Sequence, residues 1–153
     1  MPIFPLFKKK EFFSAEDKEQ IVEAIRMAEK ETSGEVRVFV ESKNAFVDPI
    51  DRAAEIFFKL KMQDTEHRNA VLLYIAMKDK QLALFADEGI YKKAGAGFWN
   101  AAVAAMLQHF NKNSYGSGIA HVVKEIGDTL QTHFPYDSNT DKNELPDDIV
   151  FGK

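Results

Sequence analysis

Residues 68–89 read RNAVLLYIAMKDKQLALFADEG and have the pattern of two short strands joined by a turn. Ala70 to Ala76 is an unbroken apolar run, which is typical of a strand covered on both faces. Lys78-Asp79-Lys80 then supplies a polar turn, and Gln81 to Ala86 is again mostly apolar. The pattern predicts a β-hairpin, in which the second strand runs antiparallel to the first.

Two helices and one further strand are expected before this hairpin. Residues 14–17 (SAED) form a capping box, and Ile21 and Ile25 follow at helical spacing, so we expect a helix to about Thr32. Residues 35–41 alternate Val with Glu, Arg and Phe, which predicts a strand whose Glu/Arg face is at least partly exposed. Asp48-Pro49 begins a second helix, which should end near Met62.

Two more helices are expected after the hairpin. Residues 94–110 are small and apolar with little polar face, which predicts a largely buried helix. Residues 111–114 interrupt it, and the last helix should cover about 117–132. The remaining tail is acidic, and we expect it to be loop-like.

The connectivity predicts where the polar loops lie. A helical connection makes the strand at 35–41 parallel to the strand at 70–76, with a right-handed crossover. The hairpin reverses the chain, so the end of its second strand lies at the same edge as the starts of the other two. Residues 33–35 (SGE), 67–69 (HRN) and 87–89 (DEG) should therefore meet, with three carboxylates, an amide and a histidine.

Composition and charge exclude several classes of function. The 153 residues are 45% hydrophobic and include 13 Phe, which suits one domain with a buried core rather than a disordered chain. The net charge of −4 gives no general attraction to nucleic acid or to an anionic membrane, so we expect neither as a partner. The absence of Cys excludes disulfides, thiol catalysis and Cys-ligated metals.

No membrane or secretion signal is expected from the sequence. The longest uncharged runs do not resemble the roughly 20 apolar residues of a spanning helix. At the N-terminus, Lys8, Lys9 and Lys10 follow the apolar segment, which is the reverse of the order in a secretory signal. We therefore expect a cytoplasmic protein without a transmembrane segment.

Taken in order, these motifs resemble the TPM domain family, named after thylakoid lumen acid phosphatase-like, photosystem II repair and acetylcholine-receptor-modulating proteins. The resemblance extends from about Ser14 to Phe134, and the tail also resembles the short bacterial branch. The motifs that carry it are Ser33-Gly34-Glu35, Arg68-Asn69-Ala70-Val71-Leu72-Leu73, Lys78-Asp79-Lys80, Asp87-Glu88-Gly89-Ile90, Phe98-Trp99, Phe110, Tyr115-Gly116-Ser117-Gly118-Ile119 and Asn143-Glu144-Leu145-Pro146.

The resemblance implies a Rossmann-like three-layer α/β sandwich with helices on both faces. Its mixed central sheet would combine the parallel crossover with the β-hairpin. Residues 1–13 would form an N-terminal arm, 14–134 the TPM domain and 135–153 an acidic tail. The family also implies divalent-metal binding at an acidic edge and an acid phosphatase activity on phosphomonoesters.

We expect the metal ligands to be Glu35, Asp87 and Glu88, with Arg68, Asn69 and Gly89 lining the same loop edge. Hard oxygen ligands favour Ca²⁺ or Mg²⁺, and the irregular coordination of Ca²⁺ suits loops better. The ion would then have a structural or interaction role, with a protein partner still to be identified. In the alternative interpretation, Glu35 lies on an exposed strand face and Asp87 and Glu88 only cap a turn.

Three other groups of residues are weaker candidates. The tail from Asp137 to Asp148 partly matches the start of an EF-hand loop, but Lys142 stands where that loop needs glycine. A phosphatase could use Arg68 to clamp phosphate, Ser33 as nucleophile and His67 as acid, although no spacing positions them together. His109, His121 and His133 are twelve residues apart, and the interruption at 111–114 prevents them from sharing one helix.

Overall fold

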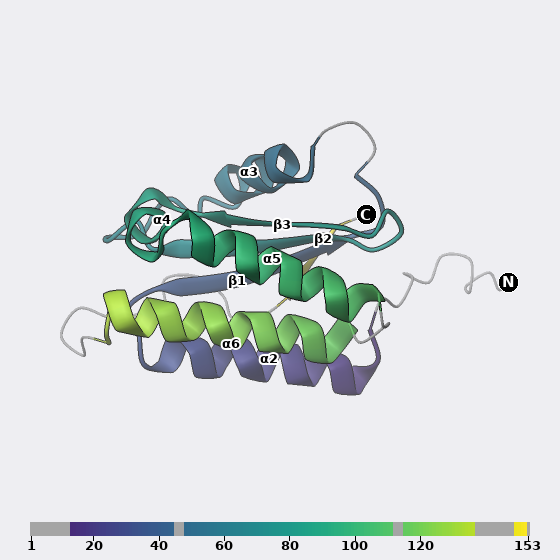
Figure 1. Ribbon diagram of the computed structural model, residues 1–153, viewed down its shortest axis with the longest axis horizontal. Coiled ribbons are helices and arrows are strands. Elements are labelled where there is room, and N and C mark those ends of the chain that lie inside the picture. Colours follow the sequence, from purple (N-terminus) through teal and green to yellow (C-terminus); the bar gives the residue numbers. More distant parts are fainter. Residues whose placement is uncertain (1–12, 45–47, 112–114, 137–148, 153) are drawn as a thin grey trace, which may run out of the picture.

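The structure is a computed structural model of the chain, and it describes residues 13–44, 48–111, 115–136 and 149–152. Within these residues it contains helices on both sides of one four-stranded sheet (Figure 1). The elements in chain order are α2 (Ala15–Lys30), β1 (Glu35–Glu41), α3 (Pro49–Lys59), β2 (Ala70–Ala76), β3 (Gln81–Ala86), α4 (Glu88–Ala94), α5 (Ala96–Asn111), α6 (Tyr115–His133) and β4 (Ile149–Phe151).

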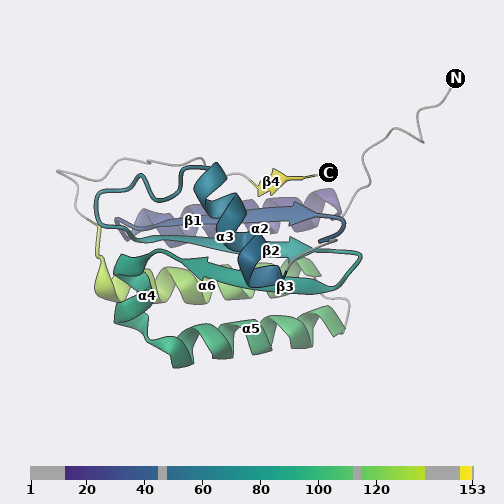
Figure 2. The same ribbon diagram turned by 90° about the horizontal axis from the view of Figure 1, so that it is seen from above.

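The sheet confirms the predicted topology. Its strand order is β3-β2-β1-β4, and Figure 2 shows this order from above. β1 runs parallel to β2, with Glu35 opposite Ala70, whereas β2 and β3 form the antiparallel hairpin. The fold is therefore a mixed three-layer α/β sandwich.

The two faces of the sheet bury different side chains. Val36, Val38 and Val40 pack with buried residues of α2, α5 and α6. On the other face, Phe39 and the even-numbered residues of β2 pack beneath α3, around the buried Phe57. α3 is the only helix of the described residues on that face (Figure 1).

Several sequence expectations were wrong in detail. The Glu/Arg face of β1 is more buried than expected, because Glu35 and Glu41 are 3% and 4% exposed and Arg37 is only partly exposed. α5 is not largely buried either, because among its residues 96–109, whose burial is described, only Trp99, Ala102 and Met106 are buried.

Two elements were not expected. Residues 88–94 form the separate helix α4, which ends at Gly95 with a φ of +85°, a value that favours glycine. The tail is not loop-like throughout, because Ile149–Phe151 forms β4, parallel to β1. Among the described helices, none has the length and apolar character needed to cross a membrane.

Candidate functional site

The three loops meet at one edge of the sheet, as the connectivity predicted. The N–H of Glu35 donates to the carbonyl of Asn69 over 3.3 Å, and Asn69 Nδ2 donates to Ser33 Oγ over 3.2 Å. The N–H of Asp87 donates to Ala70 O over 2.9 Å, so the third loop is bonded to the second. We call this arrangement the three-loop edge.

Gly89 allows the closest approach within this edge. Its N–H donates to Arg68 O over 2.8 Å. A Cβ at this position would lie 2.3 Å from the carbonyl oxygen of His67 and 2.5 Å from that of Arg68. Both atoms belong to the backbone, so only glycine allows α4 to begin here without moving the loop.

Asp87 has two roles, and both engage its carboxylate. It is the N-cap of α4, where Oδ1 accepts the N–H of Glu88 over 2.8 Å. The same carboxylate accepts two hydrogen bonds from Arg68, from Nε to Oδ2 over 2.7 Å and from the guanidinium to Oδ1 over 2.9 Å. This bidentate contact is the strong form of an arginine–carboxylate pair, and the hydrogen bonding to Asp87 raises the pKa of Arg68.

Arg68 adopts a backbone conformation that is uncommon for a residue with a side chain. Its φ is +52°, in the left-handed region. The conformation lies at the residue whose carbonyl meets Gly89 and whose guanidinium meets Asp87. Uncommon backbone conformations of this kind are held by their surroundings and cluster at functional sites.

The other two expected metal ligands have contrasting environments. Glu35 is almost fully buried at the start of β1, whereas the Glu88 side chain is 65% exposed. Glu88 lies 3.8 Å from the guanidinium of Arg68, so the carboxylates of both Asp87 and Glu88 face this arginine. Asn69 is fully buried, and its Oδ1 has no hydrogen-bond partner in the described part of the chain.

As they stand, these side chains do not form a ready site for a metal ion. Among the residues that the structure describes, no three Asp, Glu or His side chains are grouped to hold one. The oxygen donors of the edge, including Asn69 Oδ1, fit a cation only if Arg68 releases Asp87. The cap expected in the alternative interpretation is present at Asp87.

The residues considered for phosphoryl chemistry are not assembled into a catalytic group. Ser33 Oγ accepts from Asn69, and the ring of His67 lies 6.0 Å from the ring of Phe134. No hydrogen bond joins Ser33 to His67 within the described ranges, and Arg68 is held by Asp87. The EF-hand-like segment from Asp137 to Asp148 lies outside the described residues.

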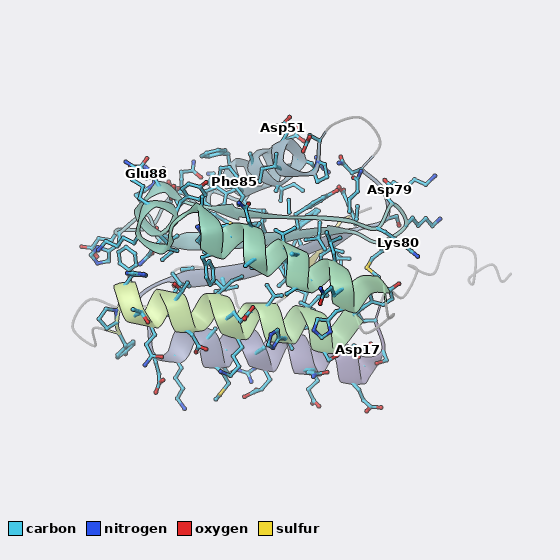
Figure 3. The ribbon with its side chains drawn as sticks, viewed as in Figure 1. Asp17, Asp51, Asp79, Lys80, Phe85 and Glu88 are labelled. Carbon is cyan, nitrogen blue, oxygen red and sulfur yellow. The ribbon has the colours of Figure 1, made fainter. Side chains whose placement is uncertain are left out.

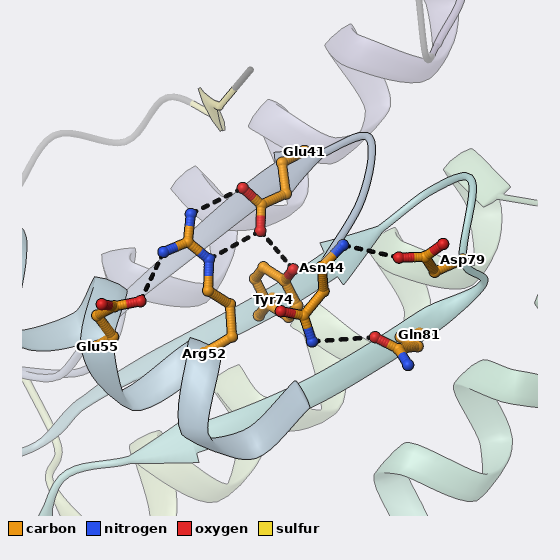
Figure 4. Close-up of polar contacts among 7 residues, drawn as sticks. All are labelled: Glu41, Asn44, Arg52, Glu55, Tyr74, Asp79 and Gln81. Atoms are coloured by element: carbon orange, nitrogen blue, oxygen red, sulfur yellow. Dashed lines mark hydrogen bonds and ion pairs between the residues drawn. The ribbon is translucent and has the colours of Figure 1, made fainter. Parts of the chain in front are cut away.

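A second polar cluster lies at the opposite end of the sheet, and the sequence reasoning did not identify it (Figure 4). Glu41, at the end of β1, accepts two hydrogen bonds from Arg52 of α3, at 2.9 and 2.8 Å, and one from the hydroxyl of Tyr74. Arg52 also contacts Glu55 over 2.6 Å. The sequence did contain one signal for this cluster: Glu41 ends a strand whose opposite face consists of valines.

The charges of this cluster are mutually stabilised. Burial alone would raise the pKa of Glu41, but hydrogen bonds from Arg52 and Tyr74 outweigh it and lower that pKa. Burial and the hydrogen bond to Glu41 raise the pKa of Tyr74 well above its ordinary value. The cluster therefore keeps a carboxylate ionised inside the fold and fastens α3 to the sheet.

The three histidines do not lie on one continuous helix, as the sequence predicted. His109 lies on α5, whereas His121 and His133 both lie on α6. The pairing of α5 with α6 brings the rings of His109 and His121 to 5.8 Å between centroids. Glu125 lies 3.7 Å from His121 Nε2. As stated above, no metal-binding group results within the described residues.

Comparison with solved structures supports the fold at two levels of similarity. The BA42 protein from the psychrophilic bacterium Bizionia argentinensis is 37% identical, with a TM-score of 0.86 over 95% of this chain and 99% of that chain. The N-terminal domain of the cg2496 protein from Corynebacterium glutamicum is 13% identical, with a TM-score of 0.63 over 91% of this chain and 80% of that chain. The N-terminal domain of a P. gingivalis protein is 14% identical, with a TM-score of 0.65 over 82% of each chain.

The sequence comparisons give the family. No curated protein matches the chain. The family profile described as the TPM domain, however, matches residues 6–129, which include the whole three-loop edge. The chain belongs to the TPM domain family.

Proposed function

We propose that this TPM domain is a module that binds a divalent cation, Ca²⁺ or Mg²⁺, at the three-loop edge. The observation that carries the proposal is the Oδ1 of Asn69, which is fully buried without a hydrogen-bond partner in the described residues. An unpaired buried oxygen is costly unless a ligand satisfies it. It lies where the loops of Glu35, Asp87 and Glu88 meet, and these supply the carboxylates that hard cations prefer.

Arg68 makes the proposed binding competitive. The Asp87 carboxylate is 4% exposed and already accepts a guanidinium, so it lies in a place that stabilises positive charge. A divalent ion that uses Asp87 has to displace Arg68, whose side chain is 40% exposed and has room to move into solvent. Calcium suits this irregular set of loop oxygens better than the strict octahedron of magnesium.

The experiment that tests the proposal is a calcium titration followed by NMR, with calorimetry on the same samples. We expect amide shifts at Gly34, Asn69 and residues 87–90, and none in the turn at 78–80. Arg68→Gln should bind calcium more tightly than the wild type, because it removes the competing charge. Arg26→Gln is the matched control, since Arg26 pairs with Glu23 on the exposed face of α2.

Two outcomes would overturn the assignment. Unchanged or weaker calcium binding by Arg68→Gln, with the fold intact, would show that Asp87 is not a ligand. Loss of the whole response in Asp137→Asn with Asp141→Asn would move the ion to the acidic tail.

Acid phosphatase activity, the alternative function, is tested on the same samples. Turnover of a small phosphomonoester with metal present, abolished by chelator and by Asp87→Asn, would support the enzyme. If the ion has only a structural role, turnover should be negligible beside the typical range of about 1–1000 per second.

A further inference from the structure

Two histidines from different helices lie next to each other on the surface of the α5–α6 pair. His109 is in the last turn of α5, and His121 is in the second turn of α6. Their ring centroids are 5.8 Å apart, and the ring planes are inclined by 42°. His109 is partly exposed and the His121 side chain is 52% exposed. Both imidazoles are therefore open to a ligand from solution.

One face of α6 carries this arrangement. Gly118, His121 and Glu125 follow one another at steps of three and four residues, which places them on the same side of the helix. A Cβ at Gly118 would lie 2.5 Å from Cβ and 2.9 Å from Cγ of His109. Glycine at this position therefore lets His109 lie directly against the face of α6 that carries His121 and Glu125.

The distances among these side chains fit ligands of one metal ion. Glu125 Oε2 lies 3.7 Å from His121 Nε2, which is too long for a hydrogen bond. Two ligand atoms of a tetrahedral zinc ion, each bound at about 2.0–2.2 Å, lie roughly 3.3–3.6 Å apart. Two imidazoles that share such an ion have ring centres roughly 5–6 Å apart, as His109 and His121 do.

The ligand types select the class of ion. Imidazole nitrogen suits zinc, copper or nickel, whereas calcium and magnesium take oxygen ligands. Two His and one Glu are a known ligand set of zinc, with a fourth position left for water. Within the described residues no arginine or lysine is paired with Glu125, and Lys124, the one lysine of α6, pairs with Asp128 over 3.2 Å. In contrast to Asp87, the Glu125 carboxylate therefore has no side-chain guanidinium or ammonium to displace.

We propose that His109, His121 and Glu125 bind one transition-metal ion of the zinc class, which joins the end of α5 to α6. The present rotamers gather no three such side chains around one point among the described residues. The two imidazoles would therefore hold the ion, and Glu125, which is 43% exposed, would turn to complete the set. α5 benefits most from such a link, because few of its described residues are buried in the fold.

This site is separate from the three-loop edge. Asp17 lies beside Gly116 at the start of α6, since a Cβ at Gly116 would be 2.3 Å from Asp17 Oδ1. Figure 3 shows Asp17 and Glu88 at opposite ends of the molecule. His121 lies in the second turn of α6, close to the Asp17 end. The zinc site therefore does not depend on the cation proposed for the three-loop edge.

The experiment titrates the full chain with zinc chloride, with and without excess calcium, and the zinc affinity should be the same in both. Calorimetry gives the affinity and the stoichiometry, and NMR of the imidazole ¹⁵N nuclei identifies the rings that bind. We expect one zinc ion per monomeric chain, with the ring signals of His109 and His121 shifted and those of His133 unchanged. Hydrogen exchange at the end of α5, over residues 103–109, should slow because the ion fastens this helix to α6.

Three variants and one control locate the ion. His109→Asn and His121→Asn should each weaken zinc binding by roughly tenfold or more, since even the outer partners of a bound metal contribute about 10–100-fold. Glu125→Gln should weaken it less, because the amide oxygen remains but its charge is lost. His133→Asn is the matched control: it lies twelve residues further along α6, about 18 Å from His121, and should bind zinc as the wild type does.

Three results would overturn the proposal. The first is that the chain binds no zinc, or that His109→Asn binds it as tightly as the wild type, which would confine any ion to α6. The second is that His133→Asn weakens binding as much as His109→Asn, which would mean that zinc binds to exposed imidazoles in general. The third is a stoichiometry of two chains per ion, which would place the ion between copies rather than between α5 and α6.

Discussion

Replacing Arg52 with Met should destabilise the protein in a strongly pH-dependent way. Arg52 makes two of the three hydrogen bonds to the Glu41 carboxylate, which is almost fully buried between β1 and α3. Met keeps the apolar contacts of the Arg stem but leaves the carboxylate with only the hydroxyl of Tyr74. An ionised carboxylate without its counter-charge is among the most costly groups to bury.

The expected loss follows from how exposed the pair is. Removing one partner of a fully buried ion pair costs roughly 3–5 kcal/mol. The Arg52 side chain is 28% exposed, so solvent already screens part of the attraction and about 2–3 kcal/mol is expected at pH 7. This loss is a large part of the roughly 5–15 kcal/mol by which a domain is stable.

The pH dependence has a definite sign. The folded pKa of Glu41 lies below its ordinary value of 4.5, so the pair contributes stability above that value and loses it as the pH falls through the folded pKa. In Arg52→Met, the hydrogen bonds from Arg52 no longer offset the effect of burial, so the pKa of Glu41 should rise above its ordinary value of 4.5. The variant should therefore differ most from the wild type at neutral pH, and the difference should vanish in acid, where both chains carry a protonated Glu41.

Urea denaturation followed by circular dichroism, at several pH values from 7 to 3.5, measures this difference. Arg26→Met is the control, because Arg26 and Glu23 are both more than half exposed. Its free energy of unfolding should change by less than about 0.5 kcal/mol at every pH. An equal loss for Arg52→Met at pH 7 and pH 3.5 would refute the electrostatic explanation and leave only lost packing.

Three further changes test the three-loop edge and its neighbourhood. Gly89→Ala should lower the free energy of unfolding by about 1–3 kcal/mol in urea melts, because its Cβ would meet the carbonyl oxygens of His67 and Arg68; wild-type stability would contradict the close approach. Asp87→Asn should lower the melting temperature in chelator, because the charge-assisted bonds from Arg68 are lost; an apo variant more stable than the wild type would instead indicate carboxylate repulsion. Ser14→Ala should cost about 1 kcal/mol in the same melts, because it removes the N-cap of α2; no loss would mean that solvent replaces the cap.

The topology could be predicted because it depends on local patterns. The apolar run of β2 and the turn before β3 define the hairpin, and the helical connection from β1 leaves only the parallel, right-handed arrangement. These two rules were sufficient to bring residues 33–35, 67–69 and 87–89 to one edge. The meeting of the three loops was thus accessible from the sequence.

Burial on the α3 face could not be predicted from the same patterns. Strand alternation shows which residues share a face, but it does not show whether that face is covered. The alternation placed Glu35, Arg37 and Glu41 on one side of β1, as observed, while their low exposure depends on how the rest of the chain packs there. β4 was missed for a related reason, since three residues are too few to show a period.

The pairing of Arg68 with Asp87 required both the topology and a backbone detail. The sequence places these residues nineteen positions apart, and only the hairpin brings them to one edge. The φ of Arg68 is also left-handed, and arginine has no intrinsic preference for that backbone region. The contact of Arg68 with Asp87 could therefore not be expected from the residue type. The expected acidic edge therefore already contains its own cation.

The same kind of arginine–carboxylate ion pair occurs at both ends of the sheet. At each end a nearly buried carboxylate, Asp87 or Glu41, receives a bidentate guanidinium from a partly exposed arginine. They differ in what else holds the carboxylate: Tyr74 donates to Glu41 from the core, whereas Asp87 receives only the first N–H of α4. Arg68 is also the more exposed of the two arginines, and it lies in a loop, whereas Arg52 lies on the helix α3. Of the two ends, the three-loop edge is therefore the one at which we propose that an external cation competes with the arginine.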